Sequence, residues 1–165
     1  MRKQKGFSLI ELLIVVAIIL IIAAIAIPNL MRARMAANES SAAASVRTIN
    51  TAEVSYYTAY PATGFAILSV LGGAQPCTAG VATGCLLDDV LAQNGNPPAS
   101  GKNGYSYTTT TPTANQYVAA AVPLTLNSTG TRHFCSVEYA VVRFEAQSVA
   151  VPAYAACQAL LALSN

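Results

Sequence analysis

The sequence predicts an α+β fold in which one long N-terminal helix packs against an antiparallel sheet of roughly four strands. Three observations lead to this prediction. Residues 7–27 form an almost wholly apolar run, residues 29–60 carry apolar side chains at helical spacing, and several β-branched or aromatic segments separated by turn residues follow residue 104. Such an amphipathic helix can bury its apolar face against a sheet.

The apolar run contains only two polar residues, Ser8 and Glu11. As a helix it would be about 31 Å long at ~1.5 Å per residue, which is enough to cross a membrane. A cleaved secretory signal has an apolar region of only ~7–15 residues, so we expect this run to remain as an anchor. The basic residues that precede it predict a cytoplasmic N-terminus and an exported C-terminal part; they are Arg2, Lys3 and Lys5.

The segment 29–60 continues the helix and is amphipathic. Its apolar residues recur at intervals of four, three, three and four, which places them on one face; they are Ala42, Val46, Ile49, Ala52 and Tyr56. The pair Tyr60-Pro61 and then Gly64 should end the helix. One helix is therefore expected, with an exposed apolar half and an amphipathic half.

The rest of the chain, residues 61–165, should form the globular part. Short helices are expected at 65–71 and 86–91, followed by a loop at 94–101. Strands are expected at 105–111, 116–122, 132–136 and 139–144, with a turn at 112–115 joining the first two. The tail from residue 149 is apolar.

Four cysteines, Cys77, Cys85, Cys135 and Cys157, all lie beyond the apolar run. An even number in an exported domain indicates two disulfides, and four cysteines allow three pairings. We favour Cys77–Cys85 with Cys135–Cys157, because each pair closes a local loop.

The composition excludes several other functions. The chain has nine basic and seven acidic residues, and without the three leading basic residues the balance is six against seven. So weak a charge gives no reason to expect nucleic-acid binding. No phosphate-binding or dinucleotide motif is present, so we expect no cofactor and no enzymatic activity.

A metal site is not expected either. The single histidine, His133, would share a strand face with Cys135, but no second histidine is present and few acids are near in sequence. The pair Asp88-Asp89 is better explained as the start or solvated face of a short helix than as a calcium site.

Glu11 is the residue that the apolar run does not explain. A carboxylate in mid-membrane costs at least ~2.5 kcal/mol, and less near the end of a span. Either it is a tolerated residue close to the interface, or it awaits a positively charged partner from another chain.

The segment Lys5-Gly6-Phe7-Ser8-Leu9-Ile10-Glu11, continued through Ala26-Ile27-Pro28, resembles the class III signal of type IV pilins and pseudopilins. The resemblance implies a pilin fold. It also implies that a prepilin peptidase cleaves between Gly6 and Phe7 and N-methylates Phe7. The expected parts are a leader at 1–6, a transmembrane and filament-core helix at 7–28, an amphipathic half-helix at 29–60 and a head at 61–165.

The same resemblance implies a structural subunit of a helical filament, in which Glu11 pairs with the Phe7 amine of a neighbour. One expected function is a type IV pilus for adhesion, twitching motility or DNA uptake; the alternative is a major pseudopilin of type II secretion. The implied partners are other copies, the peptidase and an inner-membrane assembly platform. The implied location is the bacterial inner membrane, as a single-pass protein, before an extracellular pilus or periplasmic pseudopilus forms. A membrane-anchored enzyme or binding domain with a borrowed signal is a third alternative, which no catalytic motif supports.

Overall fold

The structure, a computed structural model, describes residues 7–74, 76–93 and 101–163. The chain divides into two compact units, residues 1–34 and 35–165. Helix α1, Leu9–Ala59, is the regular structure of the first unit and the first element of the second, and Pro28 lies inside it.

The second unit contains a five-stranded antiparallel sheet in the order β1-β2-β3-β4-β5. The α+β class is confirmed, with one strand more than expected. The strands are β1 Tyr105–Thr113, β2 Gln116–Pro123, β3 Arg132–Ser136, β4 Arg143–Ala146 and β5 Leu161–Ala162. Among the described residues, three short helices accompany them: α2 Leu68–Leu71, α3 Asp89–Ala92 and α4 Tyr154–Ala159.

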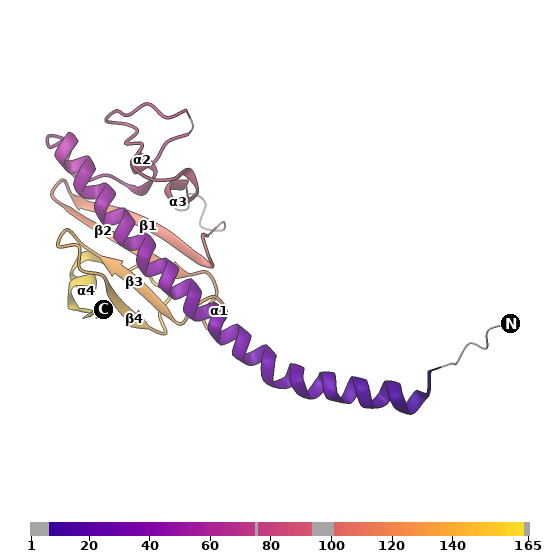
Figure 1. Ribbon diagram of the computed structural model, residues 1–165. Helices are drawn as coiled ribbons and strands as arrows, with labels where there is room; N and C mark the ends of the chain where they lie inside the picture. The colour runs from indigo at the N-terminus through magenta and orange to yellow at the C-terminus, as the bar shows by residue number, and fades with distance from the viewer. Residues whose placement is uncertain (1–6, 75, 94–100, 164–165) are drawn as a thin grey trace. The chain divides into compact units, whose positions relative to one another are not determined.

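The second part of α1 lies across one face of this sheet (Figure 1). All five residues of the predicted apolar stripe are buried, so that prediction is confirmed. Beneath them, Ala119 and Ala121 of β2 present small side chains that let the helix approach closely. Aromatic residues complete this core: Tyr105, Tyr107, Tyr117 and Phe134.

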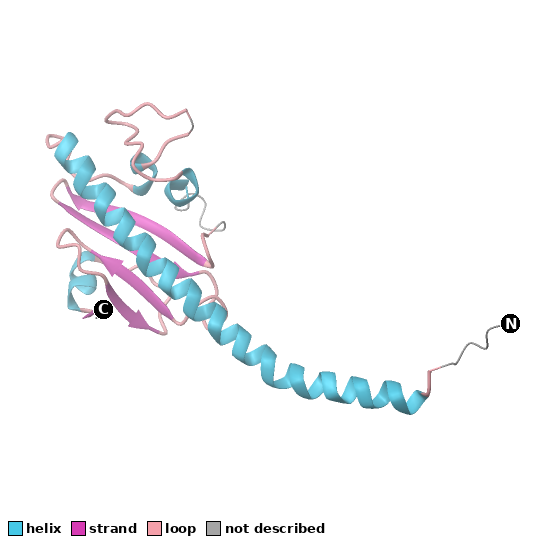
Figure 2. Cartoon of the chain, viewed as in Figure 1, coloured by secondary structure: helices cyan, strands magenta, loops and turns pink. Residues whose placement is uncertain are grey.

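A smaller core lies on the opposite face of the sheet, because alternate residues of a strand point to opposite sides. Val118, Ala120 and Cys135 pack there against Cys157 of α4. Figure 2 shows α4 beside the strands at the end of the sheet away from α2 and α3. The head therefore has helices on both faces of its sheet.

The predicted fourth strand was placed too early and has to be corrected. It was expected at 139–144, but β4 begins at Arg143. Ala140 has a φ of 57° and donates its N–H to the carbonyl of Val137, which closes a turn instead of extending the strand. The Asn50 side chain also donates to the Ala140 carbonyl, at 3.5 Å.

The C-terminal tail forms structure that was not predicted. Residues Leu161 and Ala162 make β5, which pairs with Phe144 and Arg143 of β4. The Arg143 guanidinium donates to the carbonyl of Leu160 at 2.8 Å. The short helices lie three residues from the expected starts, at Leu68 and Asp89, and most of the expected 94–101 loop lies outside the described residues.

Candidate processing and assembly site

The N-terminal end of α1 presents the residues on which processing and assembly are expected to depend. Phe7 is 81% exposed, and the helix begins two residues later at Leu9. Glu11 lies in the first turn, and its Oε2 accepts a hydrogen bond from the Ser8 N–H at 3.0 Å. Gly6, and with it the bond to be cut, lies outside the described residues.

This hydrogen bond gives Glu11 a role within its own chain. The first N–H groups of a helix have no partner inside the helix, and the helix dipole favours a negative charge near them. Glu11 satisfies one such group. Within the described part of the chain, no ion pair includes Glu11, so its charge has a helix end as its partner and no side-chain cation.

The helix surface beyond Glu11 is apolar and uncovered. An 18-residue window within α1 has a mean hydropathy of 3.3 and none of it is buried. This is one helix whose length and composition would allow it to span a membrane. Contiguous apolar surface of this extent marks a membrane or protein interaction site. Arg32 and Arg34, which follow it, are also exposed.

The packed part of α1 is fixed to the head by buried polar residues that were not predicted from the sequence. Glu39 accepts hydrogen bonds from the Thr131 N–H at 2.8 Å and the Thr131 hydroxyl at 2.7 Å. It also forms an ion pair with Arg132 at 2.7 Å. Burial by itself would raise the pKa of Glu39, but the hydrogen bonds from Thr131 and the charge of Arg132 outweigh it and lower the pKa.

Glu53 has a different environment, although it lies on the same helix. Its side chain is fully buried, and Oε2 accepts the N–H of Ala66 at 3.0 Å. Its other oxygen, Oε1, has no hydrogen-bond partner among the described residues. Burial raises the pKa of Glu53 to about 8, against the opposing effect of the Ala66 hydrogen bond.

Asn50 is another buried polar residue of the helix. Its amide donates to the Ser136 hydroxyl at 2.9 Å, and its carbonyl oxygen accepts from the Tyr117 hydroxyl at 3.0 Å. One side chain thus links α1 to β2 and β3. A signal for all three residues existed in the sequence, because Glu39, Asn50 and Glu53 fall on the helix face that carries Ala42 and Ile49.

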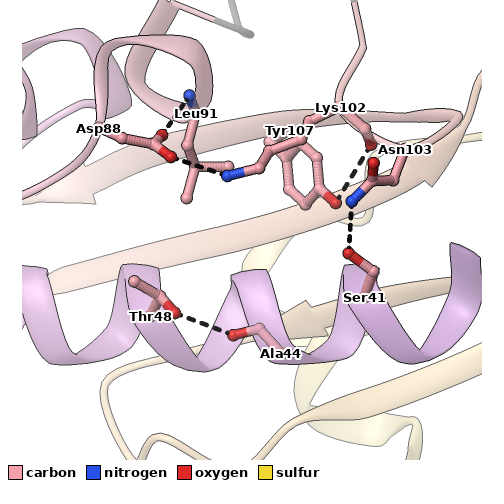
Figure 3. A network of polar contacts seen from close by, with 8 residues as sticks. All are labelled: Ser41, Ala44, Thr48, Asp88, Leu91, Lys102, Asn103 and Tyr107. Atoms are coloured by element: carbon pink, nitrogen blue, oxygen red, sulfur yellow. Dashed lines mark hydrogen bonds and ion pairs between the residues drawn. The ribbon is translucent and has the colours of Figure 1, made fainter.

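A polar network connects the segments that precede β1 to one another and to α1 (Figure 3). Asp88 accepts the Leu91 N–H at 2.7 Å and pairs with Lys102 at 2.8 Å, so it caps α3 and reaches the loop before β1. The expectation that the aspartates mark a helix start is confirmed for Asp88. Asn103 donates to the Ser41 hydroxyl at 2.7 Å and ties that loop to α1.

Two disulfides are present, Cys77–Cys85 and Cys135–Cys157, which is the pairing favoured from the sequence. Cys135 therefore has no thiolate to offer a metal, although it shares a strand face with His133. His133 is buried, and burial lowers its pKa. Within the described ranges, no three His, Cys, Asp or Glu residues are grouped as metal ligands would be.

Comparison with known proteins identifies a family motif in the N-terminal segment. Residues 1–27 match the model of the prokaryotic N-terminal methylation motif. The chain is 65% identical over 40 residues to the type IV wide pilus major component PilA4 of Thermus thermophilus, covering 24% of this chain and 30% of that protein. It is 46% identical over 55 residues to the type IV major pilin protein PilA of Myxococcus xanthus, covering 33% of this chain and 25% of that protein.

The chain thus spans about a quarter to a third of the length of these curated relatives. No solved structure matches it significantly. The matches confirm the resemblance to prepilins, which was based on the residues around Gly6 and Glu11.

Proposed function

We propose that this chain, which carries the N-terminal methylation motif of prokaryotic prepilins, is the structural subunit of a type IV pilus. The carrying observation is that the methylation motif leads directly into an apolar helix with an uncovered surface. The parts are a leader at 1–6, a membrane and filament-core helix at 7–28, an amphipathic half-helix at 29–60 and a head at 61–165. The proposed role is structural, without enzymatic activity.

The two relatives favour a pilus over a type II secretion pseudopilus. Both are described as major type IV pilus proteins, and the identity to this chain is 65% and 46% over the aligned segments. The uses of such a pilus would be adhesion, twitching motility or DNA uptake.

Before assembly, the chain is proposed to be a single-pass protein of the bacterial inner membrane. The basic residues before Phe7 would stay cytoplasmic and the head would be exported. A prepilin peptidase would then cut between Gly6 and Phe7 and methylate the new amine. The filament would form on an inner-membrane assembly platform and end outside the cell.

Glu11 is proposed to favour the transfer of the subunit from the membrane into the filament. Cleavage removes the basic side chains of the leader and creates one ammonium group at Phe7. In the free chain, Glu11 accepts the Ser8 N–H; in the filament it would accept the Phe7 ammonium of a neighbouring copy. An unpaired charge in an apolar environment is costly, so this pairing would favour assembly and set the axial register.

Intact mass and N-terminal sequencing of the protein recovered from shed filaments test the proposal. The expected product starts at methylated Phe7 and lacks the six leader residues. A chain that still starts at Met1 would refute the processing step. Electron microscopy of the growth medium decides between the two assemblies. Shed filaments in the medium would indicate an extracellular pilus, and their absence would indicate a periplasmic pseudopilus.

The role of Glu11 is tested with Glu11→Ala, with Glu145→Ala as the control because Glu145 is an exposed glutamate of the head. We expect Glu11→Ala to reach the membrane at the normal level and to give at least a tenfold loss of filaments, while the control assembles normally. Normal filament yield from stably expressed Glu11→Ala would contradict the pairing.

A further inference from the structure

The chain leaves helix α1 through a tightly held junction at residues 64–66. Gly64 has a φ of +85°, and a Cβ there would lie 2.1 Å from the Ala114 carbonyl oxygen. The Phe65 N–H donates to that same carbonyl at 2.9 Å, and the Ala66 N–H donates to Glu53 at 3.0 Å. The start of the loop is thus fixed to the β1–β2 turn and to α1.

The contact with Glu53 is the only one of these that can be changed by a proton. The side chain is fully buried, and one carboxylate oxygen finds no partner in the described part of the chain. The titratable groups that face it are two tyrosines, Tyr56 of α1 and Tyr117 of β2, while the loop offers the Ala66 N–H. No lysine, arginine or histidine among the described residues forms an ion pair with it.

We propose that Glu53 is a proton-operated latch for the loop that follows α1. With its proton bound, the buried carboxyl holds Ala66 against the helix. An ionised carboxylate without a cation is costly to bury. Loss of the proton therefore favours an open state, in which residues 64–71 move away from the helix and Glu53 is in contact with water.

The pH range of the latch follows from the two states. In the closed state burial raises the pKa of Glu53 to about 8, whereas its ordinary value is 4.5. The open state therefore releases a proton that the closed state keeps at every pH between these values. The equilibrium constant for opening should rise about tenfold per pH unit in this range and level off above it.

Opening would alter a surface beside the exposed side of α1. Leu86, in the connection between α2 and α3, lines a groove together with Arg47, Thr48, Thr51, Ala52 and Ser55. The Leu86 N–H is bound to the carbonyl of Leu71, so Leu86 depends on the segment that Ala66 leads into. If the chain is a filament subunit, as proposed above, the latch keeps this side of the subunit in its closed conformation at acidic pH.

Hydrogen exchange of the full-length monomer in detergent tests the latch without requiring filaments. The measured quantity is the protection factor of the Ala66 amide, in which the intrinsic base catalysis of exchange cancels. We expect it to fall about 50-fold from pH 6 to pH 8. It should also be insensitive to low urea, because a local opening exposes little surface.

The decisive variant is Glu53→Gln, which keeps a carbonyl oxygen for the Ala66 N–H but cannot ionise. Its Ala66 protection should not change over the same range. Asp89→Asn, a change of a partly exposed carboxylate in α3, should keep the wild-type response. Should Glu53→Gln fail to fold, carbon-13 titration of the wild-type Glu53 carboxyl replaces it, with an expected midpoint near 8.

Four results would overturn the latch: an Ala66 protection that is constant with pH, an unchanged slope in Glu53→Gln, a Glu53 midpoint near 4.5, or an Ala66 protection that falls with urea in parallel with the β2 amides. The last would mean that Ala66 is exposed only by global unfolding. Each result is independent of whether the chain forms filaments.

Discussion

Helix α1 buries two glutamates, one near each end of its packed part. One is stabilised in its charged form and the other in its neutral form. Glu39 keeps its charge, because Arg132 and Thr131 surround it with donors. Glu53 meets one backbone N–H and no cation among the described residues, so burial favours its neutral form. The same residue type on the same helix face thus gives a permanent ion pair at one end and a titratable contact at the other.

The largest expected effect is the pH dependence that Glu53 gives to global stability. Because its folded pKa is about 8 and its ordinary pKa is 4.5, the stabilisation is complete in acid and is lost as the pH rises toward 8. The free energy of unfolding of the wild type relative to Glu53→Gln should fall by about 1.4 kcal/mol per pH unit between pH 5 and pH 8.

Urea denaturation of both proteins in detergent at each pH measures this difference. Subtraction matters because the lowered pKa of His133 gives the opposite slope below pH 6.5, equally in both proteins. A difference that stays constant from pH 5 to pH 8 would show that Glu53 is charged at neutral pH, and the contrast with Glu39 would disappear.

The second effect concerns the ion pair at the other end. Arg132→Met should lower the free energy of unfolding by about 3 kcal/mol at pH 7, because it leaves the Glu39 carboxylate buried without its cation. It also removes the guanidinium that lies 5.6 Å and 5.3 Å from the ring centres of Phe134 and Phe144. The double variant Arg132→Met with Glu39→Gln should recover part of the loss; no recovery would mean that lost packing, and not the buried charge, is the cause.

Asn50, a buried polar residue that cannot titrate, provides a reference for the pH dependence of Glu53. Asn50→Leu leaves the hydroxyls of Tyr117 and Ser136 without their partner, so it should cost about 2 kcal/mol. The cost should be the same at pH 5 and pH 8, because no proton is involved. A pH-dependent cost in urea denaturation would show that Asn50 is coupled to Glu53 through Tyr117, which faces both.

The sequence predicted regular, strongly patterned elements well and predicted the exceptions poorly. The apolar stripe of α1 follows from helical periodicity. The strand 132–136 and the first two strands follow from β-branched and aromatic residues bounded by turn residues. β5 has only two residues and cannot show an alternation. The turn at Ala140 depends on a left-handed backbone that nothing in the local sequence marks. The buried partners of Glu39 and Glu53 come from residues distant in sequence, so neither pKa could be inferred from the pattern.

The smallest expected effect is that of an exposed ion pair, which isolates burial as the variable. Lys102 and Asp88 lie 2.8 Å apart, about as close as Arg132 and Glu39, and the two cations are similarly exposed, but Asp88 is 56% exposed whereas Glu39 is 8% exposed. Lys102→Met should therefore cost less than about 1 kcal/mol, since Asp88 still accepts the Leu91 N–H and water replaces the lysine. If urea denaturation at pH 7 gave a loss as large as that of Arg132→Met, distance alone would determine the strength of these pairs, and burial would not explain why Glu39 and Glu53 differ.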